Sequence, residues 1–362
     1  MRKNILILGP NPFNPKINHS GGQLTAITHL VGYIEKYQMT YDILDTFRST
    51  FPPPSAKEKL LSARDNYTKL KKLLKENRYE GALVFGTHGL GFWEKLFFSL
   101  IIEKSHTKVL FFIRSGHFMD AVIQDKHRVP LKKFLMNKIS YVGYQGGKWE
   151  EFYDKVGIKK EKLVKILNWI EIPSYTKERK DDEKTVFLYV GWMVEKKGVN
   201  ELLDVILEHK DLSQHQFIFA GGGTLLDELK ERVKDKNLTN VLFTGWIDKE
   251  ALATYYKKSD VLILPSHAEG FPNVILEALG YHLSIISTDI GAISESVIDG
   301  YNGYLIEPKD KVLLYQKIKK IGDSKLLQEE FSKKSAEIIV KNHSINVNCE
   351  KIFTLFKTTN KR

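Results

Sequence analysis

The chain has 362 residues, which is more than one ordinary hydrophobic core takes up, so its length favours two domains. Hydrophobic residues make up 42% of it and charged residues 27%, a balance that excludes a disordered chain. The single cysteine, Cys349, excludes an internal disulfide framework and a thiolate metal cluster. The sequence contains no uninterrupted run of about 18 apolar residues, so we expect no membrane-spanning helix.

The first half of the chain alternates between short apolar runs and helical patterns. The runs that predict strands lie at 5–8, 82–85, 109–113, 140–143 and 164–167. Many of them are continuous rather than alternating, as is typical of strands that are covered on both faces. The helical patterns between them place apolar residues on one face. We therefore expect an α/β domain with a parallel sheet over residues 1–172.

The excess of positive over negative charge lies entirely in this first half. Residues 1–170 hold 28 Lys and Arg against 15 Asp and Glu, whereas the remainder holds 27 against 29. Two interpretations stay open: solvated helix faces, or a surface that meets an anionic membrane or phosphorylated substrates. No nucleic-acid-binding motif accompanies the charges, so we do not expect nucleic acid as a partner.

A polar stretch at 173–184 has no apolar periodicity and is predicted to be a linker. Apolar runs then predict strands at 185–190, 216–220, 241–243, 261–264, 284–287 and 304–306. We expect a second domain over 185–343 and an amphipathic helix in the tail, 344–362. The fold class is thus α/β, with two doubly wound, Rossmann-like domains that face a central cleft. Ligands of such sheets bind beyond the carboxyl ends of the strands.

The most informative segment follows the predicted strand at 261–264. It places Glu269 in a loop and Glu277 about one turn into the next helix, which Asn273 is expected to cap. The residues between the two carboxylates begin with Gly270, Phe271, Pro272 and Asn273. The free N–H groups at the start of this helix suit hydroxyl or phosphate oxygens. The alternative is a helix-capping loop with two solvated glutamates.

This segment resembles the signature of the family-4 retaining glycosyltransferases, which have the GT-B fold. The resemblance covers the second half of the chain and, more loosely, the first half. It implies that Glu269 lies beside the donor sugar at the reacting centre and that Glu277 holds the ribose hydroxyls. It also implies that the backbone amides of the loop from Gly270 to Asn273 hold hydroxyls of the sugar.

A second match to the family begins at Gly191 and ends in Lys197-Gly198. Lys197 takes the place of the family lysine that neutralises the diphosphate of the donor, a role that a charged hydrogen bond suits. Trp192 stands where the family usually has arginine, so one cation is missing. Three alternatives stay open: compensation by Arg114, by Lys196 or by another basic side chain, a different donor geometry, or weak catalysis.

Weaker matches complete the predicted site. Trp246 resembles the segment that lines the pocket for the base, although core packing explains it equally well. Gly21 and Gly22 open a helix as the glycine pair of the family does, in contact with donor and acceptor. Arg114 follows the predicted strand 109–113, and His117 is the candidate contact to the sugar at the reacting centre.

The resemblance implies a retaining hexosyltransferase (EC 2.4) that uses a UDP- or GDP-sugar as co-substrate, with no further cofactor and no metal. The acceptor is expected to be a glycan or a lipid-linked glycan in surface polysaccharide or glycolipid biosynthesis. We expect the protein in the cytoplasm, peripheral at the inner face of the cell membrane. The alternatives are a non-catalytic nucleotide-sugar or glycan-binding subunit and a Rossmann dehydrogenase. The latter is disfavoured because Gly9-Pro10 after the first strand is no dinucleotide fingerprint.

Overall fold

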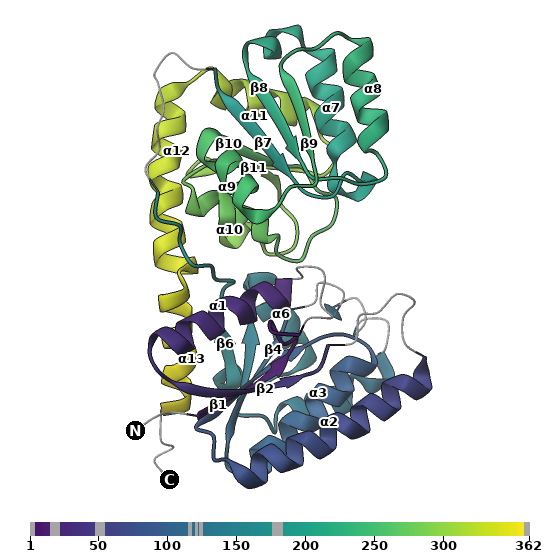
Figure 1. Ribbon diagram of the computed structural model, residues 1–362, viewed down its shortest axis with the longest axis vertical. Coiled ribbons are helices and arrows are strands. Elements are labelled where there is room, and N and C mark those ends of the chain that lie inside the picture. Colours follow the sequence, from purple (N-terminus) through teal and green to yellow (C-terminus); the bar gives the residue numbers. More distant parts are fainter. Residues whose placement is uncertain are drawn as a thin grey trace. The chain divides into compact units, whose positions relative to one another are not determined.

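The structure is a computed structural model, and it describes residues 4–14, 22–47, 55–114, 118–119, 122, 126–175 and 184–357. The chain divides into two compact units. The first comprises Met1–Trp169 and Ile345–Arg362, and the second comprises Ile170–Ser344. Each unit contains one six-stranded parallel sheet with helices packed on it (Figure 1), which confirms the predicted fold class.

The sheet of the first unit has the strand order β2-β1-β3-β4-β5-β6. Its strands are β1 (Asn4–Gly9), β2 (Thr40–Asp45), β3 (Gly81–Gly86), β4 (Lys108–Ile113), β5 (Tyr141–Tyr144) and β6 (Leu163–Lys165). β3 is buried along its whole length, as its run of small and apolar residues predicts. The strand β2 was not predicted from the sequence. It lies at the edge of the sheet and is mostly half-buried, so it lacks the continuous apolar run of the central strands.

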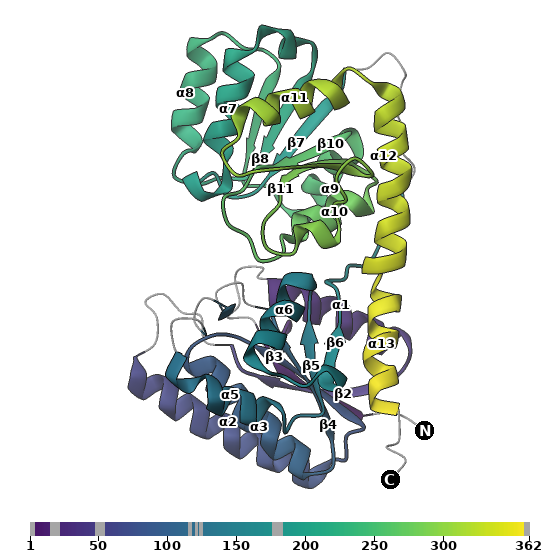
Figure 2. The ribbon, with the colours of Figure 1, turned by 180° about the vertical axis from the view of Figure 1, so that it is seen from behind.

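Helices cover both faces of this sheet (Figure 2). They are α1 (Gly22–Lys36), α2 (Ala56–Glu76), α3 (Leu90–Lys104), α5 (Val129–Met136), α6 (Gly147–Val156) and α13 (Ile345–Lys357). One core contains residues of α1 and α13, and the other contains residues of α2, α3, α5 and α6. The helix α2 begins with a capping box, in which the Ser55 hydroxyl accepts from the Glu58 amide and the Glu58 carboxylate accepts from the Ser55 amide.

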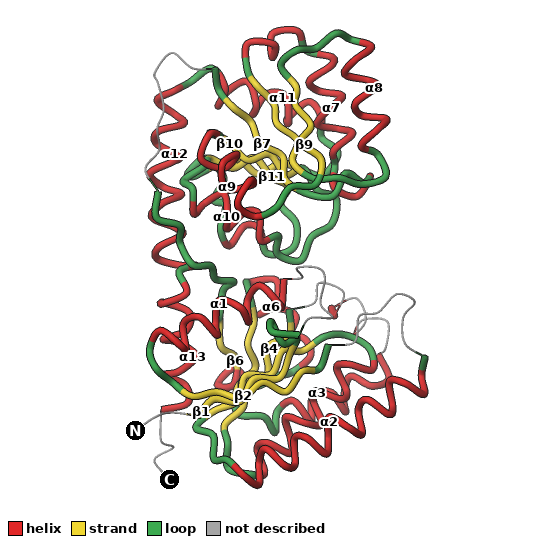
Figure 3. The backbone as a smooth tube through the Cα atoms, in the orientation of Figure 1, coloured by secondary structure: helices red, strands yellow, loops and turns green. Residues whose placement is uncertain are grey.

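The sheet of the second unit has the order β12-β11-β10-β7-β8-β9. Figure 3 labels β7, β9, β10 and β11 of this sheet. Its strands are β7 (Val186–Val190), β8 (Gln216–Ala220), β9 (Val241–Gly245), β10 (Val261–Leu264), β11 (Ser284–Thr288) and β12 (Gly303–Ile306). Its helices are α7 (Val199–Glu208), α8 (Leu226–Asp235), α9 (Lys249–Lys258), α10 (Asn273–Gly280), α11 (Lys311–Gly322) and α12 (Lys325–Ile338). Each of its strands overlaps an apolar run that predicted a strand.

The chain passes from the first unit to the second at Trp169–Ile170 and returns at Ser344–Ile345. The Ile170 amide donates to the His343 carbonyl at 3.0 Å, so the two crossings lie together. The final helix, α13, packs on α1 within the first unit, where Cys349 is fully buried. Part of the stretch predicted as the linker, residues 176–183, lies outside the described residues.

Candidate functional site

The second unit has its topological switch point at β7. This strand pairs with β10 on one side and with β8 on the other, so the crossovers diverge from there. In open parallel sheets the ligand crevice lies outside the carboxyl ends of the strands at such a point. The segments that follow β7 and β10 are the two that the sequence singles out, at Gly191–Lys197 and at 265–273.

The switch point holds an ion pair between Lys197 and Glu269. Lys197 ends a short 3₁₀ helix after β7, and Glu269 lies in the loop after β10. The side chains are 20% and 11% exposed. The Ser266 hydroxyl also donates to Glu269 Oε1 at 2.9 Å, so this carboxylate is held from two sides. The arrangement offers an ammonium that suits a phosphate next to a carboxylate that suits a hydroxyl donor.

Two glycines bring the loops of this site close together. Gly198 has a φ of +67°, and a Cβ on it would lie 1.9 Å from the Pro265 carbonyl oxygen. Gly291 has a φ of +58°, and a Cβ on it would lie 2.3 Å from the Gly270 oxygen. The same Gly270 oxygen accepts a bond from the Ala292 amide at 2.9 Å. The backbone around Glu269 is therefore fixed by close contacts that only glycine allows.

The helix α10 begins at Asn273, and Pro272 occupies the cap position without a side-chain bond. The prediction that Asn273 caps the helix was wrong by one residue. The physical reason is that Pro272, at φ −75° and ψ 120°, already provides the extended residue that leads into the first turn. Phe271 is half-buried, and its ring centroid lies 5.9 Å from that of His343.

Glu277 lies in α10, one turn after Asn273, as predicted. The Tyr256 hydroxyl of α9 donates to Glu277 Oε2 at 2.9 Å. Burial raises the pKa of Glu277 above its ordinary value, although the bond from Tyr256 acts in the opposite direction. The Tyr256 ring stacks on Tyr281 with a centroid separation of 5.3 Å. Glu277 is thus a positioned carboxylate rather than a solvated one.

Two exposed tryptophans lie at the ends of β7 and β9. Trp192 is 60% exposed and Trp246 is 62% exposed, and their ring centroids are 4.9 Å apart in an edge-to-face arrangement. Core packing is therefore not the explanation for Trp246. The Trp192 carbonyl accepts from the Tyr189 hydroxyl at 2.9 Å, which fixes the backbone next to Gly191.

In the first unit, Arg114 follows β4 and lies over two aromatic rings. Its guanidinium carbon is 5.7 Å from the Phe112 centroid and 5.3 Å from the Trp169 centroid. Burial lowers the pKa of Arg114 to about 9, so it stays cationic at neutral pH. Its Nη1 atom is buried and has no hydrogen-bond partner within the described residues. Gly22 is the first residue of α1.

Two of the predicted site residues, Gly21 and His117, lie outside the described residues. Sequence reasoning also missed two residues that hold the carboxylates, Ser266 and Tyr256. Ser266 is three residues before Glu269, so the motif itself contained a signal for it. Tyr256 reaches Glu277 only through the packing of α9 on the sheet, and no local pattern signals this.

The described residues contain neither a metal-binding cluster nor a membrane-spanning helix. In those parts of the chain, no group of three or more His, Cys, Asp and Glu side chains is arranged to hold a metal ion. Among the described helices, none is both long and apolar enough to cross a bilayer.

Residues 174–338, which contain the switch point with Lys197, Glu269 and Glu277, match the model of the family Glycosyl transferases group 1. This match confirms, for that part of the chain, the resemblance predicted from the sequence. The match includes nearly all of the second unit.

The chain is also similar to proteins of known or suggested function. An uncharacterized glycosyltransferase of Methanocaldococcus jannaschii is 34% identical over 154 residues, which are 41% of this chain and 43% of that protein. The capsular polysaccharide biosynthesis glycosyltransferase CapM of Staphylococcus aureus is 24% identical over 241 residues, 64% of this chain and 59% of CapM. The chain thus spans about half the length of the curated relatives it matches.

A solved structure extends the likeness to the first unit. HepE of Anabaena, in complex with UDP, has a TM-score of 0.71 with 15% identity, over 99% of this chain and 100% of that one. At this identity the match shows the fold alone, and it confirms the GT-B fold.

Proposed function

We propose that the protein transfers a sugar from a UDP- or GDP-sugar to a hydroxyl of a glycan or lipid-linked acceptor, with retention at the anomeric carbon. The observation that carries the proposal is the Lys197–Glu269 pair at the switch point, with the positioned Glu277 eight residues beyond Glu269. The family of this segment, the role of CapM in capsular polysaccharide biosynthesis and the UDP bound to HepE support it. Surface polysaccharide or glycolipid biosynthesis is the setting we propose.

In this proposal each site residue of the second unit contacts a different part of the donor. Departure of the nucleoside diphosphate leaves an oxocarbenium-like centre on the sugar. Lys197 stabilises the negative charge that develops on the diphosphate, and Glu269 accepts a hydrogen bond from a sugar hydroxyl. Glu277 accepts bonds from the ribose hydroxyls. His117 remains our candidate for a further contact to the sugar.

The test is a panel of UDP- and GDP-sugars incubated with the purified protein, with release of free nucleoside diphosphate as the readout. We expect one donor to be cleaved above the rate without protein, and the Lys197→Ala variant to cleave it far more slowly. Donor binding without cleavage, even with acceptors added, would favour the non-catalytic binding subunit instead. The exposed Trp192 in the place of an arginine is the observation behind that second candidate.

We expect Trp192→Arg to strengthen binding of the donor by about 1–2 kcal/mol, because it returns a cation to the diphosphate. Trp192 is 60% exposed, so the change should alter the free energy of unfolding by no more than about 0.5 kcal/mol. Calorimetry of nucleoside diphosphate binding measures the first quantity, and thermal unfolding measures the second. Trp192→Gln is the matched control that removes the indole without adding charge. Equal affinities of the two variants would show that position 192 does not face the diphosphate.

The first unit carries a basic and partly apolar face that we propose meets the inner surface of the cell membrane. The helices α2 and α3 pack together, with a ring separation of 6.1 Å between Tyr67 and Phe97. Leu60, Leu61 and Phe97 are exposed on these helices. Exposed lysines of α2 accompany them, namely Lys69, Lys71, Lys72 and Lys75.

We expect the protein to sediment with vesicles that contain anionic lipid, and to be released as salt rises from about 0.1 to 0.5 M. Reversing the charge of Lys71 and Lys75 to Glu should weaken this binding at least tenfold, since each charge near the surface contributes about 1 kcal/mol. The matched control reverses Lys257 and Lys258, two exposed lysines of α9 in the second unit. Equal binding to neutral vesicles, or equal losses of binding in both variants, would show that the α2 lysines are ordinary solvated surface residues.

A further inference from the structure

A contact between an imidazole and a carboxylate lies two residues from Glu269 in the second unit. His267 Nε2, in the loop after β10, is 2.9 Å from Glu201 Oε1, in the first turn of α7. The two side chains are 16% and 18% exposed, so solvent and salt screen this contact less than they screen a surface pair. The contact is attractive when the imidazole is protonated.

The polar atoms of this contact are incompletely satisfied. Among the described residues, His267 Nε2 and Glu201 Oε2 are buried atoms without a hydrogen-bond partner. His267 Nε2 and Glu201 Oε1 are close but are not aligned as a hydrogen bond, so charge alone holds the two side chains together. Burial of such atoms destabilises the fold. Natural proteins accept a loss of this kind at sites where the position of a group matters more than stability.

The backbone of His267 makes a further connection to the segment after β7. Its amide donates to the Lys196 carbonyl at 2.9 Å, directly before Lys197. His267 therefore joins the two loops twice, through its amide to the segment before α7 and through its imidazole to α7 itself. The two connections lie on either side of Gly198, at which the 3₁₀ helix ends and α7 begins. They fix the segment of Lys197 against the loop of Glu269 without using either of those side chains.

We propose that His267 and Glu201 form a clip that holds the two loops of the donor site together while the donor is bound. The inference rests on the proposed function, in which Lys197 binds the diphosphate and Glu269 binds a hydroxyl of the sugar. Once both side chains bind the donor, their ion pair no longer joins the two loops. The clip uses neither side chain and stays closed. His267 and Glu201 are thus positioning residues that act through Lys197 and Glu269.

A small displacement of these loops affects transfer more than it affects binding of the diphosphate. A catalytic group has to lie within about 0.5 Å of its productive geometry, and a displacement of about 1 Å can lower the rate about 100-fold. Glu269 has a short side chain on the displaced loop, whereas Lys197 reaches the phosphates with a long and flexible one. The bond from the Ala292 amide to the Gly270 oxygen restrains the Glu269 loop on the side of β11. The clip supplies the restraint on the side of β7.

The first test separates turnover from binding. We expect Glu201→Gln and His267→Gln each to lower kcat for the donor by about tenfold or more. The Kd of free nucleoside diphosphate should change by less than about threefold. The double variant should lose no more than either single variant, because both changes open the same clip. An unchanged kcat in the folded Glu201→Gln variant would overturn the proposal. Equal losses of kcat and of diphosphate affinity would also overturn it, because a general disturbance of the site predicts them.

The matched control breaks a similar contact at the opposite edge of the same sheet. His215 Nε2 lies 3.3 Å from Asp323 Oδ1, and His215 directly precedes β8 at its amino end. Asp323→Asn should leave kcat and the affinity for the diphosphate unchanged. Glu228→Gln, in the first turn of α8, controls for the loss of a negative charge at the start of a helix. A fall of kcat in either control as large as that in Glu201→Gln would overturn the proposal.

The second test measures hydrogen exchange in the absence of a donor. The exchange rate of the His267 amide, which bonds to the Lys196 carbonyl, reports whether the two loops stay together. Glu201→Gln alone should raise this rate by less than about threefold, because the Lys197–Glu269 pair still joins the loops. In the background of Lys197→Met/Glu269→Gln, the same change should raise it by about tenfold or more. Equal effects in the two backgrounds would overturn the proposal.

The two tests tell failure of this inference apart from failure of the proposed function. If the protein cleaves no donor, the proposed function fails, and the exchange rates alone decide whether the clip exists. If the protein cleaves a donor while Glu201→Gln leaves kcat unchanged, the glycosyltransferase proposal stands and the clip is refuted.

Discussion

Lys197→Ala is expected to lower turnover of the donor roughly 10²–10³-fold, the loss that follows removal of one preorganised group from a developing charge. Lys197 is the cation after β7 that pairs with Glu269, and Trp192 supplies no charge in the place of the family arginine. The readout is the rate of nucleoside diphosphate release at saturating donor. Lys230→Ala, on the exposed face of α8, is the matched control for a lysine that is lost elsewhere in the unit.

The same substitution removes the partner of Glu269, so part of its effect could come from instability. Both side chains are largely buried, and breaking such a pair leaves an uncompensated charge. The double variant Lys197→Met/Glu269→Gln removes both charges and should recover most of the lost thermal stability. It should not recover turnover. If the double variant turns over the donor at the rate of the unaltered protein, the diphosphate does not bind at this lysine.

The sequence predicted the architecture well because the informative strands lie inside the sheets. β10 is buried along its whole length, and its sequence is the continuous apolar run that such a position favours. The edge strand β2 is half-buried over most of its length and has no such run, and it was missed. Boundaries between the units were harder to place. The chain crosses at Trp169–Ile170, within the mostly apolar segment 166–172, where no change in composition marks a boundary.

The candidate site was predicted as far as its local motifs extend. The segments that carry Lys197, Glu269 and Glu277 can be recognised in the sequence from their glycines, their prolines and the strands before them. What the sequence does not contain is the tertiary contact that holds each group. The pairing of Lys197 with Glu269 spans 72 positions, and the bond from Tyr256 to Glu277 depends on the packing of α9. Only the fold brings such partners together.

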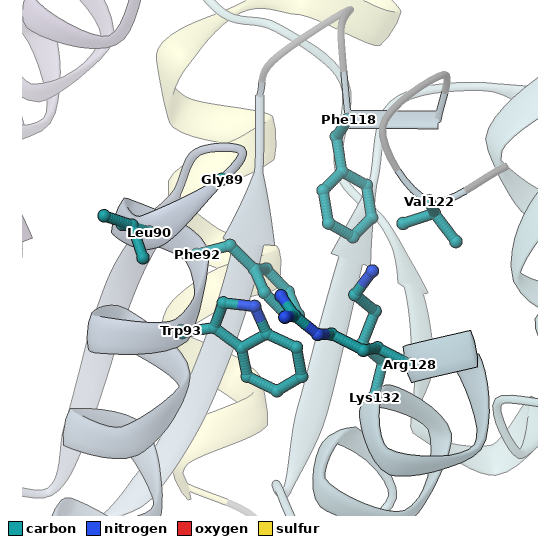
Figure 4. Close-up of a pocket in the computed structure, with 8 residues that line it drawn as sticks. All are labelled: Gly89, Leu90, Phe92, Trp93, Phe118, Val122, Arg128 and Lys132. Atoms are coloured by element: carbon teal, nitrogen blue, oxygen red, sulfur yellow. The ribbon is translucent and has the colours of Figure 1, made fainter. Parts of the chain in front are cut away.

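A cavity of about 260 Å³ in the first unit shows the same limit (Figure 4). The residues that line it come from the start of α3, from the segments that follow β4 and from α5, which are separated in the sequence. From the sequence, the apolar stretch around Phe92 and Trp93 was interpreted as a core helix, with a membrane-contacting face as the alternative. The structure buries Phe92 and Phe98 but leaves Phe97 exposed, so the helix contributes to the core and to the surface.

We expect Glu277 to lower the stability of the fold at neutral pH and to strengthen binding of the donor. Burial raises the pKa of Glu277 above its ordinary value of 4.5, so the folded protein holds this proton more tightly than the unfolded chain does. Stability from this group is therefore present below pH 4.5 and is lost as the pH rises through the raised pKa. At neutral pH the buried charge destabilises the fold. A carboxylate retained at such a position suggests a role in binding.

We accordingly expect Glu277→Gln to raise the thermal stability at pH 7, with the gain disappearing as the pH falls below 4.5. The amide oxygen can still accept the bond from Tyr256, so packing is preserved.

Affinity for the nucleoside diphosphate should fall in both Glu277→Gln and Glu277→Ala. The loss in the alanine variant should be about 1.5–3 kcal/mol, roughly ten- to hundredfold, because hydrogen bonds from the ribose to a charged group disappear. Calorimetry with the diphosphate and with its 2′,3′-dideoxy analogue measures this loss. The unaltered protein should discriminate between the two ligands, whereas Glu277→Ala should bind both alike. If Glu277→Ala keeps full discrimination while folded, another group holds the ribose and Glu277 is a buried carboxylate without a ligand.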